Sequence, residues 1–333
     1  MFCLLRQTFD DRIQSLDWTC SIQGFSVSLT GEFYCSNIEQ VFVMWIILVL
    51  IYGILKGIRD IAKKKALTIS GVTEVLFVYT LLAFIFTVPT CGGLSGIVGV
   101  PGREMGMIAF KSFIIFVAFL CSFYAIEKMP ISLYGVLDLS RMLFAMILGV
   151  TVLGEHLKVT QIIAMILVAA GLLMLKYKPK AVRDGLVWEE KIPVIIYVLA
   201  FVSTFLNALS GMFDKILMGG GNITSGQLQF WYMLFMVIYY GIYVIVTKCK
   251  INWKGVLKNP YVWIISVLFV IADRCLFIAN GYGDSRVTVM TLLKQVCCIV
   301  TIAGGRIIFK EKNTLQRFIC AAVIIAGIVI SVL

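Results

Sequence analysis

A small set of charged side chains interrupts the long apolar segments of this sequence. These residues are Lys56, Asp60, Asp138, Arg141, Asp214, Asp273, Arg274 and Lys294. A charge at the centre of a membrane helix costs about 2.5 to 3.5 kcal/mol on insertion scales, so such side chains face protein or water. They are therefore the candidates for binding a polar solute or for passing a proton.

Two apolar segments, 131–152 and 286–308, carry their polar residues on one helical face. The faces are formed by Tyr134, Asp138 and Arg141, and by Thr291, Lys294 and Gln295, respectively. Together with Asp273 and Arg274 they are the candidates for lining a substrate cavity, and Lys56, Asp60 and Asp214 are secondary candidates. Because Asp138 and Lys294 occupy equivalent positions in an internal repeat described below, we expect them on matching walls of one cavity.

Two interpretations of these charges stay open. In the functional one, Lys294 and Arg141 meet an anionic or carboxylate-bearing part of a solute, while Asp138 tunes them or relays a proton. In the structural one, Asp138 forms a salt bridge with Arg141 or Lys294 that holds the protein together, which contributes little net stability when buried. Charge reversal of Lys294 to Glu distinguishes the two, because transport that survives it excludes solute contact.

The remaining candidates have simpler local explanations. Asp273 and Arg274 are adjacent, so on a helix they point in different directions, one into the cavity and the other to a partner. Lys56 and Asp60 are spaced i, i+4 and can pair along one helix. Asp214 lies near the end of its apolar segment, and the same local explanation applies to it.

Composition restricts the function to the membrane. The sequence is 60% hydrophobic and 14% charged, with a mean hydropathy of +0.98, far from the composition of a soluble domain. The net charge of +11 fits cytoplasmic loops rich in Lys and Arg, so no nucleic-acid partner is expected. Scattered cysteines without a CxxC pair and the single His156 give no metal, cofactor or catalytic set. We therefore expect no enzyme.

The apolar segments predict an all-α integral membrane protein with ten transmembrane helices. Their approximate ranges are 44–62, 70–90, 107–126, 131–152, 158–176, 193–217, 225–247, 260–280, 286–308 and 314–333. Runs near the roughly 20 residues that span a bilayer, without barrel alternation, favour helices. Residues 1–43 are polar and unlike the rest, which predicts either a disordered tail or a mis-annotated start upstream of Met44.

An internal repeat divides the membrane region into residues 44–178 and 192–333. A shift of 156 residues places Glu155 on Glu311 and Gly171 on Gly327, so each half contains five spans. Because five is odd, the second half enters the membrane inverted relative to the first. The glycines are expected to allow close helix contact.

Loop charges predict the orientation. Most Lys and Arg residues outside the spans follow spans 1, 3, 5, 7 and 9, and only Arg103, Lys111, Lys158, Lys215 and Arg286 are assigned to the loops after spans 2, 4, 6 and 8. The positive-inside rule then places both termini outside the cell membrane.

The pattern resembles the EamA-like transporters of the drug/metabolite transporter superfamily. The resemblance is carried by VLGEHLKVTQIIAMILVAAGLLML and, more faintly, by IFKEKNTLQRFICAAVIIAGIVISVL. It implies a cavity between the halves that opens alternately to each side, with a small polar or amphipathic metabolite as substrate and a solute or proton gradient as energy source. Two fused halves need no partner subunit, so a monomer in the lipid bilayer is expected. The alternatives are a flippase-like carrier of a lipid-linked sugar and, from another class, an intramembrane enzyme or receptor.

Overall fold

A computed structural model of the chain describes residues 30–91, 97–153, 159–174, 192–282, 290, 293–311 and 314–332. Residues 1–29, most of the polar segment, and Thr291 and Glu155 lie outside these ranges. The chain divides into two compact units, Met1–Val41 and Phe42–Leu333, and the apolar helices belong to the second.

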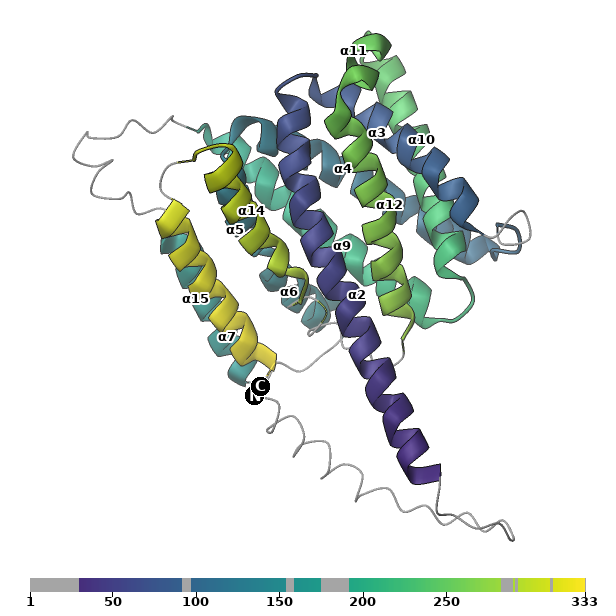
Figure 1. The fold of residues 1–333 in the computed structure, drawn as a ribbon, viewed down its shortest axis with the longest axis vertical. Coiled ribbons are helices and arrows are strands. Elements are labelled where there is room, and N and C mark those ends of the chain that lie inside the picture. The colour runs from purple at the N-terminus through teal and green to yellow at the C-terminus, as the bar shows by residue number, and fades with distance from the viewer. Residues whose placement is uncertain are drawn as a thin grey trace, which may run out of the picture. The chain divides into compact units, whose positions relative to one another are not determined.

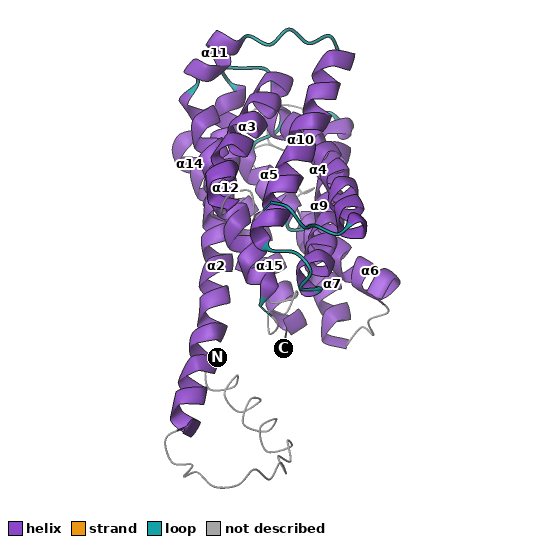
Figure 2. Cartoon of the chain, turned by 90° about the vertical axis from the view of Figure 1, so that its right-hand side faces the viewer, coloured by secondary structure: helices purple, strands orange, loops and turns teal. Residues whose placement is uncertain are grey.

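The described residues form helices and contain no strand, which confirms the all-helical prediction (Figures 1 and 2). The elements are α2 (Thr30–Leu67), α3 (Val72–Thr87), the 3₁₀ turn η1 (Val88–Cys91), α4 (Gly102–Lys128), α5 (Ile131–Asp138), α6 (Arg141–Leu153), α7 (Val159–Met174), α9 (Val194–Gly219), α10 (Ser225–Val246), α11 (Trp253–Lys258), α12 (Pro260–Gly281), α14 (Val296–Ile308) and α15 (Thr314–Val332).

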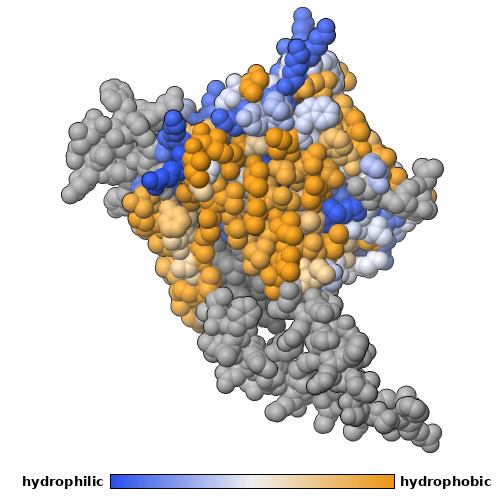
Figure 3. Space-filling view, viewed as in Figure 1, coloured by the Kyte–Doolittle hydropathy of each residue, from blue (hydrophilic) through white to orange (hydrophobic). Residues whose placement is uncertain are grey.

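Several of these helices are suited to a bilayer. Within the described residues, α4, α9, α10 and α12 are long and apolar enough to cross a membrane, and shorter apolar helices cover Val72–Thr87, Val296–Ile308 and Leu315–Gly327. Apolar residues cover most of the helical face in Figure 3, and hydrophilic residues gather at the end that bears α11. The chain is therefore a multi-pass membrane protein.

Local sequence signals set where these helices start. The Thr224 side chain accepts a hydrogen bond from the Gln227 amide at 3.2 Å, and the Gln227 side-chain oxygen accepts one from the Thr224 amide at 2.9 Å, which forms a capping box before α10. Asn259 caps α12, and Pro260 occupies its first position, where a missing amide hydrogen costs nothing.

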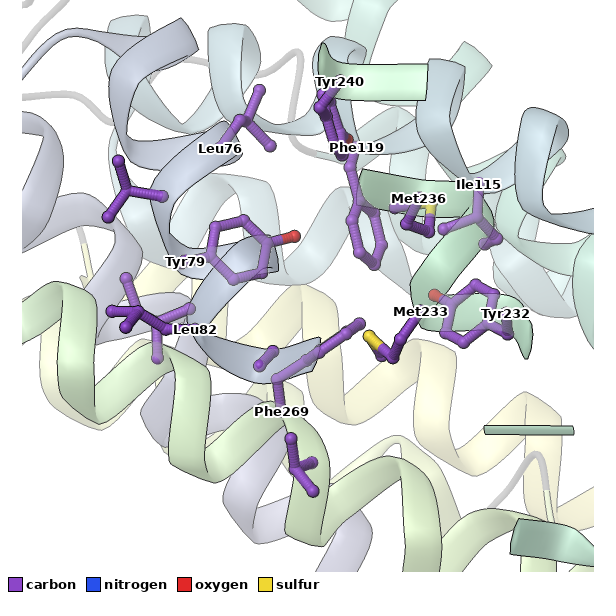
Figure 4. Packing of buried hydrophobic residues seen from close by; sticks show 14 of the residues in the cluster. Leu76, Tyr79, Leu82, Ile115, Phe119, Tyr232, Met233, Met236, Tyr240 and Phe269 are labelled. Carbon is purple, nitrogen blue, oxygen red and sulfur yellow. The ribbon is translucent and has the colours of Figure 1, made fainter. Parts of the chain in front are cut away.

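The largest core lies among α3, α4, α10 and α12 and is rich in aromatic rings (Figure 4). Tyr79 stacks on Phe123 with ring centroids 5.6 Å apart and meets Phe269 edge-on at 5.8 Å. Phe269 also contacts Phe119 edge-on at 5.7 Å. Such pairs add about 0.5–1.5 kcal/mol each beyond the area they bury, so this core holds its four helices in fixed positions.

Small residues allow the other helices to approach closely. A methyl group on Gly171 of α7 would meet Ile324 and lie 3.2 Å from the Cys320 carbonyl on α15, so the predicted close contact at Gly171 is present. These two helices lie side by side in Figure 1. On α2, Gly53 faces the carbonyl oxygens of Leu293 and Lys294, which a methyl group would approach to 3.1 and 3.3 Å.

Glu311 fastens the loop before α15 to the start of α5. Its carboxylate accepts hydrogen bonds from the amides of Ile131 at 2.6 Å and Ser132 at 3.1 Å, and from the Ser132 hydroxyl. Arg317 of α15 pairs with the same carboxylate at 3.0 Å. The sequence places an acidic residue near the start of the next helix, whereas the structure shows that Glu311 caps a helix about 180 residues earlier in the chain.

Candidate functional site

Asp138 lies at the centre of a network of buried charges. Its carboxylate is 2.5 Å from the Lys56 ammonium on α2 and 2.8 Å from the Arg141 guanidinium. Lys56 also lies 3.5 Å from Asp60, which in turn pairs with Lys63 at 2.8 Å. The expected i, i+4 contact between Lys56 and Asp60 is therefore present, but the shorter contact of Lys56 is with another helix.

The chain breaks its helix at Asp138. The sequence predicts one continuous span over 131–152, whereas α5 ends at Asp138 and α6 begins at Arg141. Leu139 and Ser140 form a turn whose amides bond to carbonyls three residues back, Val136 at 3.2 Å and Leu137 at 3.0 Å. This tighter turn rotates the two charges relative to a continuous helix, so the predicted i, i+4, i+7 face is interrupted at this point.

The helix ends oppose these charges. The carboxyl end of a helix disfavours a carboxylate, and the amino end disfavours a cation. Asp138 is the last residue of α5 and Arg141 the first of α6, so neither is stabilised by its own helix. Lys56 and the pair itself must stabilise Asp138. Amides of the first turn of α6 bond to the turn before it, that of Met142 to the Leu139 carbonyl at 3.2 Å and that of Phe144 to the Ser140 carbonyl at 3.3 Å.

A second helix interruption lies at Gln295, 156 residues after Leu139. Gln295 is a turn residue before α14, and Lys294 directly precedes it. The Lys294 ammonium lies 5.8 Å from the centre of the Tyr52 ring. Among the described residues it has no carboxylate within 4.0 Å, so the pairing of Asp138 with Lys294 is wrong and the pairing with Arg141 is confirmed as a contact.

Two further ion pairs join helices of residues 44–178 to helices of residues 192–333. Arg59 of α2 lies 3.4 Å from Asp273 of α12, and Lys111 of α4 lies 2.5 Å from Asp214 of α9. Aromatic rings surround both cations. The Arg59 guanidinium lies 4.8 Å from the Phe269 ring centre. The Lys111 ammonium lies 4.2 Å from the centre of the Tyr232 ring and 4.8 Å from that of Phe277. Both ion pairs therefore lie beside aromatic side chains.

The other candidates have defined places. Tyr134 is buried, and its hydroxyl lies 2.7 Å from that of Ser122 in a hydrogen bond. Gln295 is buried beside Lys294. Of the adjacent pair on α12, Asp273 has the ion-pair partner Arg59, whereas Arg274 is half-buried. Thr291 lies outside the described residues.

Sequence reasoning missed three cations of this interior. Arg59, Lys63 and Lys111 are assigned to loops by their charge, but their side chains are 3%, 4% and 1% exposed. Lys111 is a correction to the loop-charge pattern, since it lies inside α4 and pairs with Asp214. A signal was present for α2, because Lys56, Arg59 and Lys63 follow a spacing that keeps them near one helical face.

Comparison with known proteins supports the family resemblance. Residues 43–177 match the model of the EamA-like transporter family. One solved structure, titled only "Crystal structure of protein", superposes with a TM-score of 0.54 at 15% sequence identity, covering 84% of this chain and 95% of that chain. No curated protein matches by sequence. The structural similarity shows a shared fold, and the family match over residues 43–177 agrees with the resemblance carried by the first motif.

Proposed function

Because residues 43–177 belong to the EamA-like transporter family, we propose that this chain moves a small polar or amphipathic metabolite across a membrane by alternating access. The energy would come from a gradient of the solute or of protons. The observation that carries this proposal is the set of ion pairs between the halves, Arg59 with Asp273 and Lys111 with Asp214. Such pairs can be exchanged for a solute when the halves move.

The proposed architecture is ten spans in two inverted halves. Several helix contacts support it, because exchanging the halves converts them into one another or into themselves. The contact of α4 with α10 corresponds to that of α12 with α3, and the contact of α3 with α4 to that of α10 with α12. The self-paired contacts are α3 with α10, α5 with α14 and α7 with α15. The turns at 139–140 and at Gln295 are also equivalent under the 156-residue shift.

The interior of this carrier combines rigid and movable parts. The aromatic core of α3, α4, α10 and α12 is tightly packed. The interrupted helices, by contrast, end in the interior beside Asp138 and Lys294. Discontinuous helices near the bilayer midplane expose backbone groups that bind solutes in secondary transporters. We assign the solute contacts to these interruptions, with Arg141 and Lys294 as the residues that meet the solute.

The proposed setting is the cell membrane, with both termini outside and the protein acting as a monomer. The hydrophilic end that bears α11 (Figure 3) would then be cytoplasmic. Lys64, in the last turn of α2, donates hydrogen bonds to the carbonyls of Ile126 and Met129 at 2.7 and 2.9 Å. This contact joins the first and third spans at the proposed cytoplasmic face.

Reconstitution tests the function. Purified protein in liposomes is screened with metabolites for thermal stabilisation, and the solutes that stabilise it are then tested for gradient-driven flux. The proposal expects saturable flux that is lost in Asp138→Asn and kept in a variant of the exposed Lys128. Chemical conversion of the solute, or binding without any flux under every imposed gradient, would overturn it in favour of an enzyme or receptor.

A further inference from the structure

The interior charges do not balance. In the described residues the network contains four buried cations, Lys56, Arg59, Lys63 and Lys111, and four buried carboxylates, Asp60, Asp138, Asp214 and Asp273. Two partly exposed cations, Arg141 and Lys294, lie beside them. Six cations against four carboxylates leave an excess of two positive charges.

The excess is concentrated around Tyr52 of α2. The charges that act most on Tyr52 are those of Asp273, Arg59, Arg141 and Lys56, and the Lys294 ammonium lies over its ring. Tyr52 itself is only 6% exposed. Tyr52 is therefore a buried ring of α2 that faces the Lys294 ammonium, with further charges from α2, α6 and α12 acting on it.

Donors in this region lack acceptors. The Nε atoms of Arg59 and Arg141 are buried without a hydrogen-bond partner. Among the described residues, Lys294 has no carboxylate within 4.0 Å of its ammonium group, and it is partly exposed. More distant charges, those of Asp214, Arg141, Asp273 and Lys56, act on it electrostatically. Buried donors and unpaired cations are costly in a low-dielectric interior, so a native site of this kind calls for an acceptor.

We infer that the solute is a small dianion, a dicarboxylate or a phosphate monoester, which binds between Arg141, Arg59 and Lys294 beside Tyr52. This inference rests on the proposed function and names its substrate class. A dianion neutralises the excess of two charges. Its oxygens match the forked guanidinium donors, and the ammonium of Lys294 serves as a point charge.

Binding to the full-length protein in detergent tests the inference. Succinate and inorganic phosphate are the two dianion probes, and succinamide is the neutral control of the same length. Dissociation constants are measured by calorimetry for the wild type, for Lys294→Gln and Lys294→Arg, and for Lys128→Gln, which removes a 61% exposed surface charge.

The inference expects one dianion to bind, at least tenfold more weakly in Lys294→Gln, with affinity regained in Lys294→Arg and unchanged in Lys128→Gln. Succinate binding identifies the dicarboxylate, and phosphate binding the phosphate class. Because Lys294 has no ion-pair partner among the described residues, its neutralisation should leave the unfolding temperature unchanged, which shows that the variant is folded.

Two results separate this inference from the proposed function. Flux of a neutral or cationic solute, with neither dianion bound, overturns the substrate class and leaves the transporter intact. Tight dianion binding without flux supports the site and overturns transport. Equal binding in the wild type and in Lys294→Gln overturns the assigned position of the solute.

Discussion

Replacing Glu311 by Gln tests how strongly the loop before α15 holds the start of α5. The carboxylate of Glu311 accepts amide hydrogen bonds from Ile131 and Ser132 and pairs with Arg317. Glutamine has the same length, but it carries no charge and presents a donor in place of one acceptor oxygen. The substitution therefore removes the charge while preserving the packing.

The expected loss of stability is large for a single isosteric change. Breaking a buried ion pair by removing one partner costs about 3–5 kcal/mol, and the side chains of Glu311 and Arg317 are only 9% and 7% exposed. Arg317 keeps its hydrogen bond to the Ser132 hydroxyl at 2.5 Å, which offsets part of this cost. We expect a loss of about 3 kcal/mol in the free energy of unfolding.

Thermal unfolding in detergent, followed by tryptophan fluorescence, measures the effect against a matched control. Glu74 also accepts backbone amides, those of Gly71 at 3.3 Å and Asn252 at 3.0 Å, but these bonds are exposed. Glu74→Gln should therefore lose less than about 1 kcal/mol. Equal losses in Glu74→Gln and Glu311→Gln would refute the idea that burial and the cation make the Glu311 contact special.

Three further experiments test packing, pairing and orientation. Gly135→Ala pushes a methyl group into α14 and should cost about 1–3 kcal/mol of stability. Gly211 has open space around it, so Gly211→Ala should change stability by less than about 1 kcal/mol. Equal unfolding temperatures of the two variants would contradict the close contact at Gly135. Lys111→Met leaves Asp214 buried without its cation and should cost about 3–5 kcal/mol, and adding Asp214→Leu should restore most of it; a double variant as unstable as the single one excludes this pairing. A reporter fused to the carboxyl terminus should be active outside the cell, and activity inside would reverse the proposed orientation.

Hydropathy predicted the helices well because it depends on local composition. The segment 107–126 falls within α4 (Gly102–Lys128), and the segment 260–280 matches α12 (Pro260–Gly281). A run of apolar residues must satisfy its backbone internally in a bilayer, so its secondary structure follows from the run alone. The interruption at residues 139–140 escaped this reasoning, since Leu139 and Ser140 carry no glycine or proline signal.

The candidate site was predicted in part. The expectation that Asp138 and Arg141 face the interior agrees with their burial and contact. The role of Lys56 was underestimated, because its closest carboxylate is 82 residues away and sequence spacing reveals only partners on the same helix. Lys111 was counted among the loop charges, although it lies within α4 and pairs with Asp214 of another helix.

The sequence by itself determined that this is a helical, multi-pass membrane protein with charges that lipid cannot accommodate, because the bilayer sets both the length and the polarity of each span. Only the tertiary structure decided which charges neutralise one another. Pairing depends on where helices cross, and these crossings are fixed by the packing of small residues such as Gly53, Gly135 and Gly171 between segments far apart in the chain. The same crossings leave Lys294 without a carboxylate within 4.0 Å among the described residues, and this place is where we expect the solute.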